Sequence, residues 1–192
     1  MAQAREALRP DVARQVYRPK PRALGKSASP APDSTFQADL IDFSSNARSA
    51  TGAKYALLLA DVYSRELEGV PLKTKRPAEV NAALKDALDE MIPEGKTDYV
   101  LSTDRGGEFA KIEDVLPDDA VHREKEGRQD LAVVDRNTQT IKKDVASIIA
   151  RKGGKWDTAL KPAIKAYNER PHEAVLGPPE DVDKGVRRTS LC

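Results

Sequence analysis

The sequence predicts one α/β domain, in which a mixed β-sheet carries packed helices. Residues 36–43 and 55–63 are short apolar runs of the kind that form strands. Later segments carry apolar residues at helical spacing. Strands followed by a helix, another strand and further helices favour a layered α/β domain. The 192 residues, 39% of them hydrophobic, suffice for one core.

The first three strands are expected in the first half of the chain. The segment 36–43, FQADLIDF, predicts a strand, and the small polar residues 44–52 predict a turn after it. The run 55–63, YALLLADVY, is typical of a buried central strand. Residues 67–72 are expected to form its hairpin partner.

A helix and a fourth strand are expected next. Pro77 suits the first position of a helix. The residues that give this helix one apolar stripe are Val80, Leu84, Leu88 and Met91. Residues 98–103 predict a strand that delivers Asp104 at its carboxyl end, and a short helix is expected over 108–116.

The last part of the chain is predicted to be helical after a charged stretch. Residues 111–129 hold few large apolar side chains, which favours a loop with a short strand near Val121. Asp130 is expected to cap a helix over 131–150. A further helix is predicted over 156–168, where apolar residues share one side.

The net charge is only +1, but it is unevenly distributed. Residues 1–34 contain seven Lys and Arg, three Asp and Glu, and five prolines. We expect a basic, proline-rich flexible arm over 1–34, a folded core over 35–183 and a tail over 184–192. The arm either follows DNA phosphates or is a tail without a partner.

Composition excludes several classes of protein. One cysteine, Cys192, and two histidines, His122 and His172, exclude an internal disulfide and a zinc module of two Cys and two His. The apolar runs are too short to cross a bilayer, so neither zinc nor a membrane is expected as a partner. The charged, proline-interrupted start argues against a secretory signal. We expect an intracellular protein, and a nuclear one if its source is eukaryotic.

Three aspartates lie in separate segments: Asp39 in the first predicted strand, Asp104 after the strand at 98–103, and Asp135 in the helix predicted over 131–150. Carboxylates that converge from different elements are what two-metal phosphoryl transfer requires. Each aspartate alone has an ordinary explanation as a turn residue. On the predicted helix, the residues that share the side of Asp135 are Thr138, Gln139 and Lys142.

The region from Phe36 to about Val182 resembles the catalytic core of DDE-type integrases. Five blocks carry the resemblance, in the order found in that family: FQADLIDF, YALLLADVYSRELEGVPLKTK, LSTDRGGEF, VVDRNTQTIKK and AYNERPHEAVLGPPEDV. They look most similar to the integrases of large self-synthesising DNA transposons of the Polinton or Maverick kind. Together they span most of the chain.

This resemblance implies a ribonuclease H-like fold, with helices on both faces of the sheet, and polynucleotidyl transfer with Mg²⁺ or Mn²⁺ at a two-metal site. Asp39 and Asp104 match the first two catalytic metal ligands. Asp135 stands at the third, where the family has glutamate. The implied partner is DNA, with self-association into a homo-oligomer as a second expectation. The candidate DNA contacts, which a solvated helix face explains equally well, are Arg136, Gln139, Lys142 and Lys143.

Three functions remain open at this stage. The leading interpretation is an integrase or transposase catalytic domain that cleaves DNA and transfers strands. The second is a catalytically inactive, domesticated domain that binds DNA or a protein, which the shorter side chain of Asp135 favours slightly. The third is a stand-alone nuclease of the same fold, which hydrolyses DNA without joining it.

Overall fold

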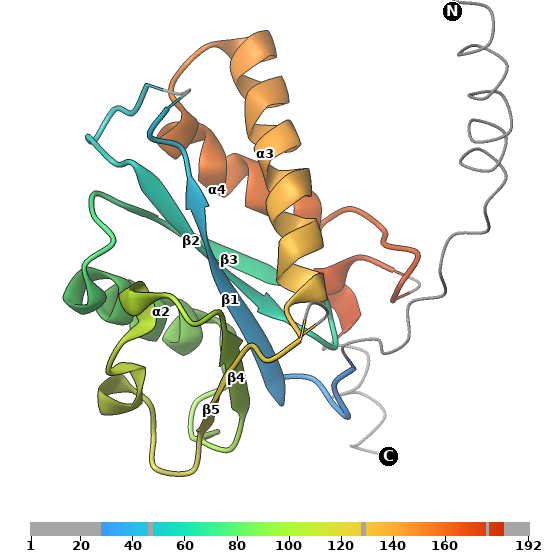
Figure 1. The fold of residues 1–192 in the computed structure, drawn as a ribbon. Coiled ribbons are helices and arrows are strands. Elements are labelled where there is room, and N and C mark those ends of the chain that lie inside the picture. The colour runs from blue at the N-terminus through green and yellow to red at the C-terminus, as the bar shows by residue number, and fades with distance from the viewer. Residues whose placement is uncertain (1–27, 46–47, 128–129, 176, 183–192) are drawn as a thin grey trace, which may run out of the picture.

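A computed structural model describes residues 28–45, 48–127, 130–175 and 177–182, and its centre is a five-stranded sheet (Figure 1). The strands are β1 (Thr35–Asp42), β2 (Tyr55–Asp61), β3 (Leu67–Leu72), β4 (Val100–Thr103) and β5 (Val121–Glu124). Their order across the sheet is β3-β2-β1-β4-β5. The first strand in the sequence is therefore the central one.

The sheet is mixed, as the sequence predicts. β1 pairs antiparallel with β2, and β2 pairs antiparallel with β3. On the other side of β1, β4 and then β5 run parallel to it. In this register Phe36 of β1 lies opposite Asp61 of β2 and Leu101 of β4. This arrangement confirms the predicted ribonuclease H-like α/β fold.

Within the described ranges, three long helices cover the sheet: α2 (Pro77–Met91), α3 (Ala132–Lys152) and α4 (Trp156–Asn168). α4 has the predicted bounds, and α2 begins at Pro77 as expected. The single short helix expected over 108–116 is instead two 3₁₀ turns, η1 (Gly107–Phe109) and η2 (Ile112–Val115). Lys111 separates them because its φ of 59° is left-handed and cannot continue a helix.

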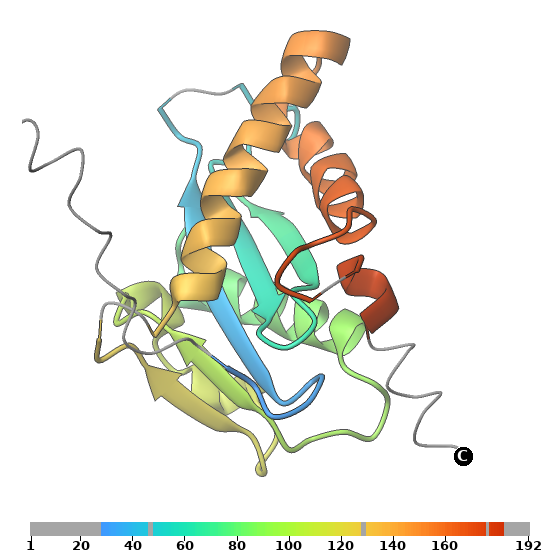
Figure 2. The same ribbon diagram turned by 90° about the vertical axis from the view of Figure 1, so that its right-hand side faces the viewer.

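The helices lie on both faces of the sheet, which gives two apolar layers. Residues of α3 and α4 pack with Ile41 and Leu58 on one face, and residues of α2 pack with Phe36 and Leu57 on the other. Figure 2 shows α3 crossing in front of β1, with α2 behind the sheet. Phe36 and Ile41 face opposite layers because side chains alternate along a strand.

The start of α3 differs from the prediction. Leu131, not Asp130, is the N-cap, and no side chain of its own caps the helix. The Asp130 carboxylate instead accepts hydrogen bonds from the backbone N–H groups of Glu126 and Gly127, at 2.8 and 2.6 Å. The predicted cap is wrong because this aspartate closes the turn that precedes the helix.

Some expectations fall wholly or partly outside the described residues. The basic arm predicted over 1–34 is described only from residue 28, and the tail predicted over 184–192 is not described. The predicted end of the core at residue 183 also lies outside. These boundaries remain predictions. Within the described ranges, no helix has the length and apolar character needed to cross a membrane.

Candidate active site

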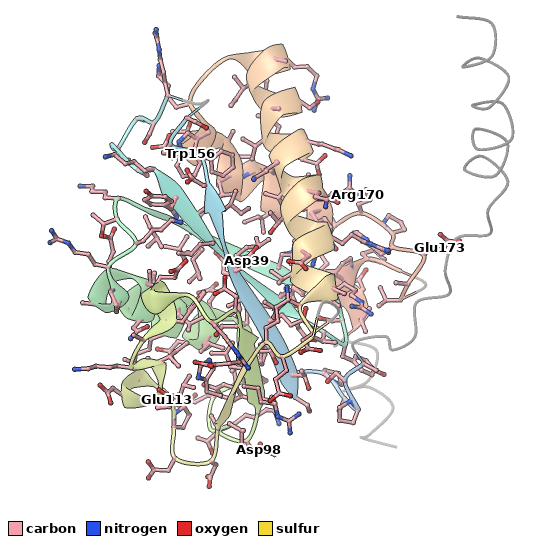
Figure 3. All side chains as sticks on the ribbon, in the orientation of Figure 1. Asp39, Asp98, Glu113, Trp156, Arg170 and Glu173 are labelled. Atoms are coloured by element: carbon pink, nitrogen blue, oxygen red, sulfur yellow. The ribbon has the colours of Figure 1, made fainter. Side chains whose placement is uncertain are left out.

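Asp39 lies in the middle of the central strand. Side chains alternate along β1, so Gln37, Asp39 and Ile41 face the layer of α3 and α4. Figure 3 places Asp39 near the middle of the molecule. Its side chain is half-buried, and the Leu40 backbone N–H donates a 2.8 Å hydrogen bond to its Oδ1. The sheet thus presents this carboxylate to α3.

Asp104 follows β4 directly and lies beside the same face. Gln37 pairs with Ser102 in the parallel register of β1 and β4, and Asp39 and Asp104 each come two residues later. The Gly106 N–H donates a 3.0 Å hydrogen bond to Asp104 Oδ1. A Cβ at Gly106 would stand 2.9 Å from that oxygen, closer than carbon and oxygen normally approach. A side chain at residue 106 would therefore require the Asp104 and Glu108 carboxylates to shift.

His122, a partly buried residue of β5, supports the strand that ends at Asp104. His122 Nε2 lies 2.9 Å from the Thr103 hydroxyl oxygen, and His122 Nδ1 lies 2.8 Å from Glu113 Oε1. The Thr103 hydroxyl in turn donates to the carbonyl of Asp104 at 2.9 Å. This chain of contacts joins η2, β5 and the end of β4.

Asp135 is on the first turn of α3, and the same helix reaches Asp39 directly. Thr138, one turn further along, donates a 3.4 Å hydrogen bond from its hydroxyl to Asp39 Oδ2. The Asp135 side chain is 46% exposed, and its Oδ2 lies 3.6 Å from Lys125 Nζ. The third acid is therefore placed by α3 and paired with a cation from the segment after β5.

The electrostatics of Asp39 show that the three acids are neighbours. Burial raises the pKa of Asp39 above its usual value, and the negative charges of Asp104 and Asp135 raise it further. Hydrogen bonds from Leu40 and Thr138 oppose this rise. Three carboxylates from β1, the end of β4 and α3 thus act on one another.

The donor chemistry of this group suits a hard divalent cation, because Mg²⁺ and Mn²⁺ prefer carboxylate oxygens. A cation would also relieve the repulsion that raises the pKa of Asp39. As placed, however, no three His, Cys, Asp or Glu side chains in the described residues are grouped so as to hold a metal ion. Asp135 instead lies within 3.6 Å of Lys125.

Two polar residues near the acids are absent from the sequence predictions. The buried Gln37 side chain bonds the first turn of α3, and Lys125 pairs with Asp135. Gln37 could have been found by the period of two along a strand, which puts it on the face of Asp39. Lys125 gives no such signal, because it follows a short exposed strand in a charged segment.

The candidate DNA contacts of α3 do not all face one way. Arg136, Gln139, Lys142 and Lys143 are all exposed. The charge of Lys142 contributes to a lowered pKa of Asp42, behind hydrogen bonds from Ser44, so Lys142 faces the end of β1. The charge of Arg136 acts on Tyr167 of α4, on another side of the helix. Their roles towards DNA remain predictions.

Comparison by sequence finds one mobile-element relative. A transposon-derived protein of Caenorhabditis elegans is 27% identical over 144 residues, which are 73% of this chain and 49% of that protein. The chain thus spans about half the length of this relative. No family model matches the sequence.

Comparison of structures finds viral integrases. A chain of the simian T-cell lymphotropic virus intasome, in complex with the PP2A regulatory subunit B56 gamma, is 15% identical with a TM-score of 0.68, covering 83% of this chain and 57% of that one. The BIV integrase catalytic core is 15% identical, with a TM-score of 0.63. The match covers 82% of this chain and 98% of the BIV chain. The HTLV-2 integrase catalytic core, in complex with magnesium in a trimeric form, is 15% identical, with a TM-score of 0.63. The match covers 81% of this chain and 99% of the HTLV-2 chain. This chain therefore has the ribonuclease H-like fold of integrase catalytic cores.

Proposed function

We propose that this domain is the catalytic core of an integrase or transposase, which cleaves DNA and transfers strands with Mg²⁺ or Mn²⁺. The observation that carries the proposal is the arrangement of three carboxylates from β1, the end of β4 and α3, where the charges of Asp104 and Asp135 act on Asp39. Three interacting carboxylates on an integrase-like fold are suited to phosphoryl transfer. Such perturbed groups are also typical of functional sites.

Each acid has a distinct role in this proposal. Asp39 and Asp104 would hold the metal from adjacent parallel strands, and Asp135 would be the third ligand from α3. When bound, the metal supplies positive charge to the attacking and leaving oxygens of the DNA phosphate. The Thr138 hydroxyl keeps the Asp39 carboxylate oriented towards α3. Asp135 must leave Lys125 to serve as a ligand.

A mobile-element origin is part of the same proposal. The transposon-derived relative supports it, and the motif blocks favour the Polinton or Maverick kind. DNA would be the substrate, and the domain would act as a homo-oligomer in the nucleus of a eukaryotic host. The exposed Lys142, whose charge acts on Asp42 at the end of β1, is one candidate phosphate contact.

One observation favours a second candidate function, an inactive domain that binds DNA or a protein. Asp135 is one methylene shorter than the glutamate of the resembling family, and Lys125 pairs with it. Mg²⁺ demands near-ideal octahedral geometry, so a short third ligand reduces the chance of a complete site. A stand-alone nuclease would use the same acids and differ only in its products.

The test is cleavage and joining of short DNA duplexes by purified protein with Mg²⁺ or Mn²⁺. Wild type is compared with Asp104→Asn, Asp135→Glu and the matched control Asp86→Asn. Asp86 is an exposed aspartate of α2, on the opposite face of the sheet. We expect activity in wild type and in Asp86→Asn, and its loss in Asp104→Asn.

The products and the Asp135 variant separate the alternatives. Joined strands identify an integrase or transposase, whereas free ends alone identify a nuclease. If wild type is as inert as Asp104→Asn and Asp135→Glu gains activity, the active-enzyme proposal fails and the inactive domain is supported.

A further inference from the structure

We propose that Gln37 is a positioning residue, which holds the third acid of the site in reach of the first by anchoring α3 to β1. This inference rests on the proposed function, because it concerns how the metal ligands are brought together. Gln37 is not itself a ligand or a catalytic group. It acts through the backbone of α3.

The Gln37 side chain makes hydrogen bonds at both ends of its amide. Its Oε1 accepts the backbone N–H groups of Val133 at 3.1 Å and Val134 at 3.2 Å. Its Nε2 donates to the carbonyl of Asp130 at 2.7 Å. Gln37 is only 2% exposed, so water does not compete for these bonds. A single side chain of β1 thus bonds both the first turn of α3 and Asp130, which lies two residues before the helix begins.

The first turn of α3 depends on this contact. The first N–H groups of any helix lack partners within the helix and need others. The cap residue, Leu131, supplies no side-chain bond, and Asp130 is turned back towards Glu126 and Gly127. Val133 and Val134 are buried, so water cannot take the place of Gln37. The helix is capped from another element, 96 and 97 positions away in the chain.

The contact joins the neighbours of two acids. Gln37 lies two residues before Asp39 on the same face of the strand, a separation of about 6.7 Å. Val134 directly precedes Asp135. The amide therefore fixes where α3 begins relative to the strand that carries Asp39. The direct hydrogen bond between α3 and Asp39, from the Thr138 hydroxyl, is long at 3.4 Å.

The amide group matches this role better than the alternatives. An amide oxygen can accept two N–H donors while its nitrogen donates to a carbonyl. A carboxylate at residue 37 could accept but not donate, and it would add a fourth negative charge beside Asp39. Precise placement of α3 also matters more with Asp135 than it would with a glutamate there, because the aspartate side chain is shorter. Sites of this kind tolerate only about 0.5 Å of displacement.

The inference is tested with Gln37→Met, which keeps a similar volume and removes all three hydrogen bonds. Two quantities are measured in the full chain: the exchange rates of the Val133 and Val134 amide hydrogens, and the affinity for Mn²⁺. We expect faster exchange at both amides. We also expect Mn²⁺ to bind about tenfold more weakly, as when other residues that support ligands are lost.

The control is Asp157→Asn, which weakens a different tertiary contact, between the start of α4 and the backbone of Ala50 and Thr51. It should lower the melting temperature and leave Mn²⁺ affinity unchanged. Gln37→Glu keeps an oxygen that can accept from Val133 and Val134, so exchange at these two amides should be slower than in Gln37→Met. Together these variants separate positioning from a general loss of stability.

Each outcome decides one claim. Wild-type Mn²⁺ affinity or unchanged amide exchange in Gln37→Met would overturn the positioning role while the proposed function stands. If wild type binds no Mn²⁺, the proposed function fails and no metal ligands exist for Gln37 to position, so this inference fails with it. In that case faster exchange in Gln37→Met would show only that the side chain caps α3.

Discussion

The hydroxyl of Tyr167 in α4 donates a 3.0 Å hydrogen bond to Oδ1 of Asn137 in α3, and both side chains are buried. Burial raises the pKa of Tyr167 to about 12, so the hydroxyl keeps its proton at neutral pH. Within the described residues, Asn137 Nδ2 has no hydrogen-bond partner. One polar pair thus joins the two helices within an apolar layer.

Removing the Tyr167 hydroxyl should therefore destabilise the domain more than removing both polar groups. Tyr167→Phe leaves the buried Asn137 without a partner, at an expected cost of about 1–3 kcal/mol in the free energy of unfolding. Tyr167→Phe with Asn137→Leu removes both groups and should recover most of that loss. Urea unfolding of the two variants measures the difference. Equal destabilisation by the single and the double variant would show that the unpaired Asn137 is not the cause of the lost stability.

Neutralising Asp39 should stabilise the metal-free protein. Burial and the charges of Asp104 and Asp135 raise the pKa of Asp39 in the folded state. The unfolded chain loses this proton more readily, so stability falls as pH rises from the unfolded to the folded pKa. Asp39→Asn avoids that loss. Its melting temperature in EDTA should exceed that of wild type at neutral pH and match it at about pH 3, where Asp39 is protonated in both states.

A higher melting temperature in Asp39→Asn should accompany a loss of Mn²⁺ binding, because the amide is a poor substitute for the carboxylate. Gain of stability with loss of a ligand is typical of a strained functional site. If Asp39→Asn is instead less stable than wild type at neutral pH, the carboxylate has a structural role and the electrostatic account is wrong.

Lys125 should compete with a divalent cation for Asp135. Its ammonium lies 3.6 Å from the Asp135 carboxylate in a partly exposed pair. Exposed pairs of this kind contribute about 0.2–1 kcal/mol, so Lys125→Met should tighten Mn²⁺ binding by at most about fivefold at low salt. The control is Lys85→Met, which breaks an exposed pair with Asp89 on α2. Weaker Mn²⁺ binding in Lys125→Met would mean that the lysine supports the metal site.

Asp157 should make the domain sensitive to acid. Burial raises the pKa of its carboxyl, but hydrogen bonds from Ala50, Ser49 and Thr51 outweigh this and hold the pKa well below its usual value. The stabilisation is present above the unfolded pKa of about 3.9 and is lost as pH falls through the folded pKa. Asp157→Asn should cost about 1–3 kcal/mol at neutral pH. Denaturation at several pH values should show that difference shrinking in strong acid.

Elements with strong local patterns were predictable from the sequence. β3 and α4 have the bounds that the apolar runs predict, because their buried residues recur at the strand and helix periods. β5 gave only a weak signal, since all four of its side chains are at least partly exposed and its pairing with β4 defines it. The helix expected over 108–116 is interrupted at Lys111 by a left-handed backbone conformation, which a lysine in the sequence does not predict.

Part of the candidate site was predictable, because local patterns of apolar residues reveal the elements that carry the three aspartates. The positions of Asp39 and Asp104 follow from strands that the sequence reveals, and Asp135 follows from the helix at α3. The bonds of Gln37 cross 93 to 97 positions of the chain, and no local pattern encodes such a contact. The roles of the three aspartates as metal ligands remain a prediction.

The capping of α3 by a residue of β1 also bears on how the domain is made. During synthesis β1 leaves the ribosome long before α3, so Gln37 has no partner until its bonds across 96 positions can form. Closing so long a loop is entropically costly and places this contact among the slow steps of folding. The three carboxylates can therefore meet only after most of the chain has emerged. A nascent or truncated polypeptide that lacks α3 has the central strand and no assembled acid centre.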